Sequence, residues 1–215
     1  MGRDKGQEYS KELMKAIEDP SPEMQETFKE EFELLKEICK DKKVLDVGCG
    51  AGRPVDKLAD YCKKVVCIDN SKELLEIAKK NLSKKENIEI FYMDAFNMGF
   101  ENNEFDVVYA TYNLIGCVDS KGRLIEEMAR LTKKGGTLII FTWKRDEKTT
   151  EFLKKYYSNL GFKIKNIDKE KTVINKFIFE RVDPNLIKDL FKEIGLKEIK
   201  ITSVGAWNAI IGKKT

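Results

Sequence analysis

The sequence predicts an α/β fold with a doubly wound, mostly parallel sheet, and three observations support this prediction. Short apolar runs, typical of buried strands, alternate with segments of helical periodicity. The first strand ends at three glycines in alternate positions, Gly48, Gly50 and Gly52, where the backbone must turn sharply. A helical pattern follows at once, so strand, turn and helix together form the nucleotide-binding half of an α/β unit.

Length and composition fit one domain with an appendage. The chain has 215 residues, 41% of them hydrophobic, and its 40 basic and 37 acidic side chains leave a net charge of +3. This balance argues against a nucleic-acid partner. Histidine is absent and the five cysteines form no C-x-x-C pair, so we expect reduced thiols, a cytoplasmic location and no metal site. No apolar run reaches the ~20 residues of a membrane span, and residues 1–19 do not resemble a signal peptide.

The elements follow in a regular order up to the fifth strand. Residues 19–22 are a proline-rich turn signal, after which apolar residues recur at helical spacing to about residue 40. Ser71 predicts an N-cap for the helix after the second strand, and Gly135-Gly136 predicts the turn into the fifth. The expected strands cover 44–47, 64–68, 88–92, 104–110 and 137–143, and the expected helices 53–60, 71–82 and 120–132.

The pattern changes after Trp143. A helix is predicted at 150–160, and the alternating segments 162–168 and 172–181 fit an antiparallel hairpin. A helix from Asp183-Pro184 to Gly195 and two strands at 198–203 and 206–212 complete the sheet with an antiparallel edge pair. We therefore expect an N-terminal lid and helix (1–40), a cofactor-binding core (41–143), a helix-plus-hairpin insertion over the substrate rim (144–181) and the end of the core sheet (182–215).

Acidic residues lie at the carboxyl ends of the first three predicted strands. Asp46 is near the end of the first strand, Asp69 follows the second and Asp94 the third. Ligands of doubly wound sheets bind beyond these strand ends, and an acid after the second strand is placed to accept both ribose hydroxyls. The alternative for each is a helix cap or a loop acid, but the coincidence of all three with the glycine turn favours a nucleotide site.

The glycine spacing narrows the class of nucleotide. A dinucleotide fingerprint is G-x-G-x-x-G/A, which aims a helix N-terminus at a pyrophosphate. Gly48-x-Gly50-x-Gly52 does not fit it, and the frame from Gly50 places Val55 where a small residue is needed. We therefore expect a turn that wraps a ligand without a pyrophosphate.

At these residues the chain resembles the class I S-adenosylmethionine (SAM) dependent methyltransferases. It is most similar to the small-molecule type, whose domains are called methyltransferase domain 11 and methyltransferase domain 25. Five motifs in residues 44–143 carry the resemblance, in the family's order and spacing. They are the glycine turn, the acidic loop 67–71, the loop 92–95, the strand 105–108 and the segment 131–138. The resemblance implies a Rossmann-like seven-stranded sheet of order 3-2-1-4-5-7-6, with strand 7 antiparallel and an insertion after strand 5.

The resemblance also implies where the cofactor SAM lies. Asp46, Gly48 and Gly50 would border its methionine end, Asp69 would hold the ribose, and Asp94 with its neighbour would meet the adenine. Cys49 is interpreted as a small packing residue rather than a nucleophile. The candidates for the cofactor site are Asp46, Gly48, Cys49, Gly50, Asp69, Asn70, Asp94, Ala95 and Thr111.

The methyl acceptor is expected beside residues 110–116, after the fourth strand. This segment resembles the Asn-x-x-Gly segment of some small-molecule N-methyltransferases, which makes Tyr112 and Asn113 the candidate catalytic residues; a loop aromatic and a turn-forming Asn are the alternative. Tyr9 belongs to the expected lid, and the planar fork of Arg145 suits a carboxylate. The candidates for substrate binding are Tyr9, Tyr112, Asn113, Trp143 and Arg145.

Methyl transfer from a sulfonium is an in-line displacement that needs a general base only if the nucleophile arrives protonated. Because the chain has no histidine, we expect an acceptor that is already nucleophilic, or a base drawn from Asp, Glu or Tyr. The leading hypothesis is transfer to N or O of a small molecule. Lysine pairs in 154–171 keep RNA or protein methylation open as an alternative, and a non-catalytic SAM-binding regulator is another. The oligomeric state is left open.

Overall fold

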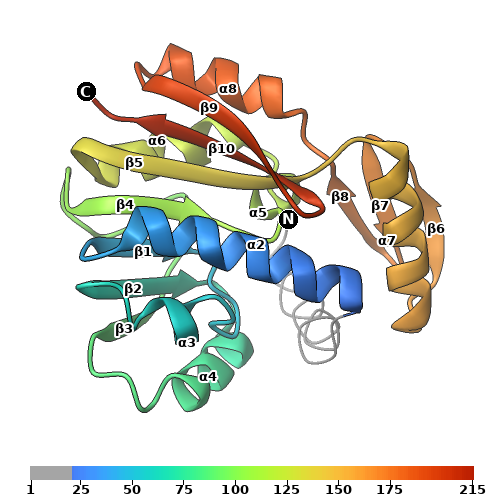
Figure 1. Ribbon diagram of the computed structural model, residues 1–215, viewed down its shortest axis with the longest axis horizontal. Coiled ribbons are helices and arrows are strands. Elements are labelled where there is room, and N and C mark those ends of the chain that lie inside the picture. Colours follow the sequence, from blue (N-terminus) through green and yellow to red (C-terminus); the bar gives the residue numbers. More distant parts are fainter. Residues whose placement is uncertain (1–20) are drawn as a thin grey trace.

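Seven strands form the central sheet of this computed structural model, which describes residues 21–215 (Figure 1). Across the sheet they lie in the order β3 (Ile88–Tyr92), β2 (Lys64–Asp69), β1 (Lys43–Val47), β4 (Phe105–Ala110), β5 (Thr132–Trp143), β10 (Trp207–Lys213) and β9 (Lys197–Val204). Only β10 runs antiparallel to its neighbours, β5 and β9. The predicted order and the antiparallel seventh strand are therefore confirmed.

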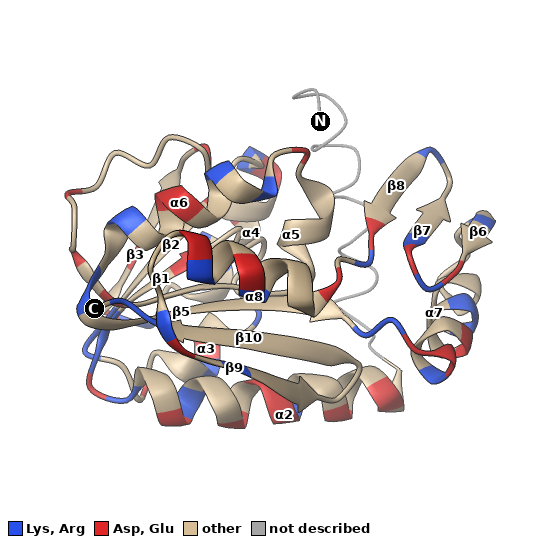
Figure 2. Ribbon diagram, turned by 90° about the horizontal axis from the view of Figure 1, so that it is seen from above, with Lys and Arg blue, Asp and Glu red and all other residues tan. Residues whose placement is uncertain are grey.

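Helices cover both faces of the sheet, which makes three layers (Figure 2). α2 (Pro22–Cys39), α3 (Val55–Leu58) and α4 (Lys72–Asn81) pack on one face, and α5 (Leu114–Cys117), α6 (Lys121–Leu131) and α8 (Pro184–Glu193) on the other. Each face has its own buried apolar cluster. Among the described helices, none has the length and apolar character needed to cross a membrane.

Strand β5 begins five residues earlier than the sequence predicts. The expected start was Thr137, after a helix to residue 132, whereas α6 ends at Leu131 and β5 starts at Thr132. Gly135 has a φ of +76°, and the pairing of β4 with β5 is irregular between Phe105 and Val107. Thr132, which precedes the glycine pair, still pairs with Phe105. The two glycines therefore form an irregularity inside the strand rather than a turn before it.

The segment after β5 contains one more strand than predicted. It comprises α7 (Glu147–Asn159) and a separate antiparallel sheet of β6 (Ile164–Ile167), β7 (Lys171–Ile174) and β8 (Phe177–Glu180). The hairpin prediction was wrong because 172–181 was interpreted as a single strand. Asn175 adopts a φ of +49° and reverses the chain between β7 and β8.

A buried arginine joins the two ends of this insertion. Arg181 is 1% exposed, and its Nη1 donates to Thr150 Oγ1 at 2.6 Å and to the Asp168 carbonyl at 2.7 Å. Its Nη2 donates to the carbonyl of Lys144. The start and the end of the insertion are thereby tied together at one point.

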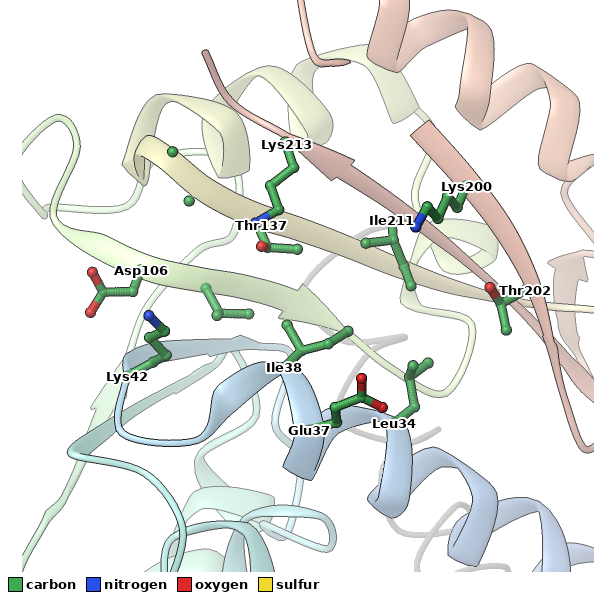
Figure 3. Close-up of a pocket in the computed structure, with 13 residues that line it drawn as sticks. Leu34, Glu37, Ile38, Lys42, Asp106, Thr137, Lys200, Thr202, Ile211 and Lys213 are labelled. Atoms are coloured by element: carbon green, nitrogen blue, oxygen red, sulfur yellow. The ribbon is translucent and has the colours of Figure 1, made fainter. Parts of the chain in front are cut away.

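Helix α2 runs across the sheet and is fixed to the β9–β10 turn. Glu30 Oε2 accepts a hydrogen bond from Gly205 N at 2.7 Å, and Thr27 Oγ1 accepts one from Ala206 N at 3.1 Å. A Cβ on Gly205 would lie 2.4 Å from Thr27 Oγ1, so this contact requires glycine. Toward its C-terminus, α2 borders a cavity of about 450 Å³ (Figure 3).

Candidate active site

The glycine turn after β1 is tight and closely flanked. Gly48, Gly50 and Gly52 have φ values of +74°, +55° and +80°, in the left-handed region that favours glycine. A Cβ on Gly48 would lie 2.9 Å from Leu114 Cδ2, and one on Gly52 would lie 2.7 Å from Leu82 Cδ1. The turn thus needs glycine for its backbone conformation, and leucine side chains pack closely against it.

Asp69 holds this turn to the loop after β2. Its carboxylate accepts hydrogen bonds from Gly50 N at 2.9 Å and Ser71 N at 2.8 Å. Burial raises the pKa of Asp69, and the backbone N–H groups oppose that shift. A carboxylate offers about four lone-pair sites, so each oxygen can accept a further donor. Asn70 beside it is exposed.

Asp46 lies buried beneath the turn. It is 0% exposed, and neither carboxylate oxygen has a hydrogen-bond partner among the described residues. Burial raises the pKa of Asp46 to about 8; the charges of Glu31 and Asp69 add to this, while the Tyr109 hydroxyl and Arg53 oppose it. At neutral pH this side chain is therefore mostly a neutral carboxylic acid.

Two charged residues that the sequence prediction missed lie next to Asp46. Arg53 Nη1 forms an ion pair with Glu31 Oε2 at 2.6 Å, and Glu31 is 0% exposed. The guanidinium of Arg53 lies 3.8 Å from the ring centroid of Phe28, while its Nη2 is buried without a partner in the described part of the chain. Burial raises the pKa of Glu31, and Arg53 opposes the shift.

A sequence signal for this ion pair existed. Glu31 occupies a core position of α2, between the buried Thr27 and Leu35 at intervals of four residues. An acid in the apolar stripe of a helix requires a buried partner.

The loop after β3 adjoins Asp69 but is open to solvent. Met93 N donates to the Asp69 carbonyl at 3.0 Å. Asp94 is exposed, and its Oδ1 accepts a hydrogen bond from Phe96 N at 2.9 Å, the loop-acid geometry that was the alternative interpretation. Ala95 is half-buried beside it.

The segment after β4 has an unusual backbone. Thr111 is buried, and the next two residues, Tyr112 and Asn113, have φ values of +49° and +59°. Left-handed conformations at non-glycine residues cost about 1–3 kcal/mol each and concentrate at functional sites. The strain brings Tyr112 and Asn113 to the carboxyl ends of β4 and β5.

The Asn113 amide links β5 to the end of the insertion. Its Nδ2 donates to the Glu180 carbonyl at 2.9 Å, and its Oδ1 accepts from Thr142 Oγ1 at 3.2 Å. A Cβ on Gly116 would lie 2.1 Å from the same Glu180 carbonyl. The Asn-x-x-Gly segment therefore packs tightly against the end of β8.

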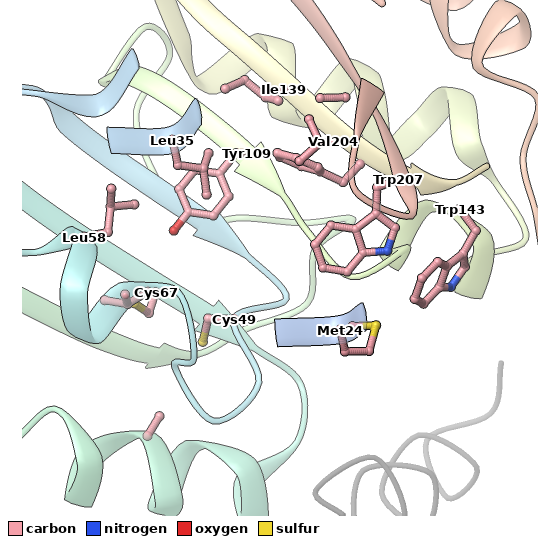
Figure 4. Packing of buried hydrophobic residues seen from close by; sticks show 14 of the residues in the cluster. Met24, Leu35, Cys49, Leu58, Cys67, Tyr109, Ile139, Trp143, Val204 and Trp207 are labelled. Carbon is pink, nitrogen blue, oxygen red and sulfur yellow. The ribbon is translucent and has the colours of Figure 1, made fainter. Parts of the chain in front are cut away.

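Five aromatic side chains, which we call the aromatic wall, gather beside this segment: Phe28, Tyr112, Trp143, Tyr156 and Trp207. The ring centroids of Tyr112 lie 6.0 Å from Trp143 and 5.9 Å from Trp207, and the two indoles are 5.5 Å apart (Figure 4). The hydroxyls of Tyr112 and Tyr156 are 3.5 Å apart. Residues from α2, the β4–α5 loop, β5, α7 and β10 thus pack into one cluster, in which Phe28 and Tyr112 are half-buried and the other three side chains are buried.

Arg145, a predicted substrate residue, is not part of this wall. Arg145 Nη1 lies 3.4 Å from Asp183 Oδ2, its Nη2 lies 3.5 Å from Glu170 Oε1, and its Nε donates to the Lys169 carbonyl. It therefore cross-links the insertion to the loop before α8. Tyr9 and the predicted lid lie outside the described residues.

Comparisons with known proteins identify the family of this chain. The model of the methyltransferase domain family matches residues 45–140. A demethylmenaquinone methyltransferase of Staphylococcus saprophyticus is 30% identical over 173 residues, which cover 75% of this chain and 72% of that protein. The enzyme of the same name from Paenarthrobacter aurescens is 34% identical over 99 residues, which cover 46% and 38%.

Solved structures share the fold. A protein of Pyrococcus horikoshii superposes with a TM-score of 0.80 at 22% identity, covering 97% of this chain and 99% of that one. A SAM-dependent methyltransferase of Aquifex aeolicus superposes with a TM-score of 0.69 at 19% identity, covering both chains completely.

Proposed function

Because this chain belongs to the class I SAM-dependent methyltransferases, we propose that it methylates a small molecule with a flat, largely apolar ring. The observation that carries this proposal is the aromatic wall. Flat ligands stack on or against aromatic side chains, and apolar pockets with few polar groups are typical of small-molecule sites. Tyr112, which is half-buried, would provide the ring on which the ligand stacks, and the buried Trp143 and Trp207 would support it from behind.

The cofactor is SAM, and we place it across the glycine turn. Its ribose hydroxyls would donate to the free lone pairs of Asp69, and its adenine would lie beside Asp94 and Ala95. Cys49, Asn70 and Thr111 would line the remaining edges. This placement uses the strained turn and the loops that adjoin it at the carboxyl ends of β1 to β4.

Arg53 is proposed to bind the carboxylate at the amino-acid end of SAM. Its Nη2 is a buried donor without a partner among the described residues, and such a donor lowers stability unless a ligand pairs with it. Glu31 holds the guanidinium in place through Nη1, so Glu31 is a positioning residue.

The acceptor atom is proposed from chemistry and from the relatives' names. The sequence-based expectation of N or O stays a prediction. The Staphylococcus saprophyticus relative is named for demethylmenaquinone, a quinone, and a ring of that kind would fit the aromatic wall equally well. Trp143 and Tyr156 would wall the ring on the side of the insertion (144–181).

Methylation of a macromolecule is the weaker alternative. Lysines of the insertion suggested it, but Lys154 pairs with Glu151 at 2.7 Å and Lys169 with Glu147 at 3.4 Å. Paired surface charges attract phosphates less than free ones do.

Transfer of a labelled methyl group tests the proposal. Purified protein is incubated with methyl-labelled SAM and an aromatic amine, a phenol, a naphthalenediol, bulk RNA or a peptide mixture. Labelled product is expected with one of the ring compounds, and Tyr112→Ala should raise KM for that compound while SAM affinity stays constant. Tyr61→Ala, which removes an exposed ring remote from the wall, is the control. Label in RNA or peptide only would overturn the proposal.

A further inference from the structure

A cavity lies at the opposite end of the sheet from the glycine turn. Its volume is about 450 Å³, within the usual range of about 300–1,000 Å³ for small-molecule sites. Its floor is formed by Val107, Thr137 and Ile211 of three adjacent strands. Val107 pairs with Thr137, and Ile211 pairs with Ile139, two residues further along β5. Leu34 and Ile38 of α2, four residues apart and half-buried, form an apolar side wall (Figure 3).

Positive charge surrounds this apolar floor. Lys42, Lys200 and Lys213 line the cavity, and none of the three forms an ion pair with another described residue. Asp106 at the rim is already matched by Lys133, whose Nζ lies 2.8 Å from its Oδ1. Glu37 is the remaining acid in the lining, so three lysines face one uncompensated carboxylate.

The three lysines outnumber the acids of the lining, so the electrostatic potential of the cavity favours an anion.

We propose that this cavity is a binding site for a small anionic amphiphile, separate from the methyl-transfer site. A carboxylate or phosphate head would lie among Lys42, Lys200 and Lys213, and an apolar body would cover Ile211 and the Leu34–Ile38 wall. Thr137 in the floor and Trp143 in the aromatic wall are both on β5, six residues apart, which corresponds to about 20 Å at the usual strand rise. One molecule of this size does not reach both.

The concave apolar floor favours a small amphiphile over a macromolecule or a membrane. A nucleic-acid or membrane surface would engage an open basic face, whereas here the lysines stand around a hollow with half-buried aliphatic side chains at its base. The charge pattern also disfavours a second copy of the chain, because the same lysines would then repel across the contact unless acids of the partner met them.

Binding of decanoate, with decyltrimethylammonium and acetate as comparisons, tests the proposal. Calorimetry should find one decanoate site on the full chain, with the cationic amphiphile and acetate at least roughly tenfold weaker. In methyl NMR, the Ile211 and Ile38 resonances should shift with decanoate. Lys200→Glu/Lys213→Glu should weaken decanoate about tenfold, since each exposed charge pair is worth up to about 1 kcal/mol.

Controls separate this site from the proposed function. Lys84→Glu reverses an exposed charge elsewhere and should leave decanoate affinity unchanged. SAM affinity should be unchanged in the double variant, whatever the methyl acceptor proves to be. Equal affinity for both amphiphile charges, unchanged binding in the double variant, or binding to anionic vesicles without binding of free decanoate would each overturn the proposal.

Discussion

The pKa values of acidic residues are shifted in opposite directions at the two ends of the parallel strands. At the carboxyl ends, burial raises the pKa values of Asp46 and Asp69. At the amino ends, the pKa values of Glu104 and Asp106 are lowered: burial opposes the shift, but hydrogen bonds from Lys43 and Lys133 and backbone N–H groups outweigh it. The same sheet therefore destabilises carboxylates at one end and stabilises them at the other.

This difference distinguishes charged pairs that stabilise the fold from buried groups that await a ligand. The amino-end acids are partly exposed and paired, Lys43 with Glu104 at 2.7 Å and Lys133 with Asp106 at 2.8 Å. The carboxyl end instead keeps buried polar atoms without partners on Asp46 and Arg53, as far as the described residues go. Such groups lower the stability of the empty protein and are satisfied when a ligand binds.

The largest expected effect concerns Arg53. Arg53→Gln should weaken S-adenosylhomocysteine by about 10- to 100-fold, since a hydrogen bond between charged groups is worth about 1.5–3 kcal/mol. Methylthioadenosine lacks the amino-acid end, so its affinity should not change. Calorimetry with both ligands measures the ratio.

Arg130→Gln is the matched control from the amino end, because Arg130 also forms an ion pair, with Glu127 at 2.7 Å. It should leave the affinities of both ligands unchanged. A loss of equal size for the two ligands in Arg53→Gln would contradict carboxylate binding and leave Arg53 a purely structural residue.

Asp69→Asn should have the next largest effect. An amide keeps one acceptor for the backbone but loses the charge and one acceptor oxygen, so SAM should bind about tenfold more weakly. The ribose is common to both analogues, and methylthioadenosine should therefore weaken by the same factor as S-adenosylhomocysteine. Unchanged affinities would place the ribose elsewhere.

Asp46 should couple cofactor binding to protons. In the folded chain the pKa of Asp46 is about 8, above its ordinary value of 3.8. Between these two pH values unfolding releases a proton, so the free energy of unfolding falls as pH rises toward 8. The sulfonium and ammonium of SAM should lower this pKa, so binding at pH 7 should release up to one proton. Calorimetry in buffers of different ionisation enthalpy measures it, and Asp46→Asn should abolish the release.

The smallest effect is expected at the amino end. Asp106 has a lowered pKa, so its contribution to stability is present at neutral pH and is lost as pH falls through the folded value. Because the pair with Lys133 is partly exposed, Asp106→Asn should lower the free energy of unfolding by less than about 1 kcal/mol. The loss should shrink in high salt; a loss as large as that of a buried pair would erase the contrast between the two ends.

The sequence allowed prediction of features that local patterns determine. Apolar runs predicted the strands and the glycines at 48, 50 and 52 predicted the tight turn, because strand periodicity and left-handed φ values are properties of neighbouring residues. The strand order came instead from the family resemblance. The Glu31–Arg53 pair was missed because its partners lie 22 positions apart and meet only when α2 packs over the turn. The third strand of the insertion was missed because it depends on the conformation of one asparagine, Asn175.

The aromatic wall has a spectroscopic consequence. The chain contains two tryptophans, and both belong to this wall. Trp207 is fully buried, with the Arg53 guanidinium 5.9 Å from its ring. Light that excites indole alone therefore reports on this buried cluster and on no other part of the molecule. Unlabelled protein thus carries its own optical probe at the place where the acceptor is proposed to bind.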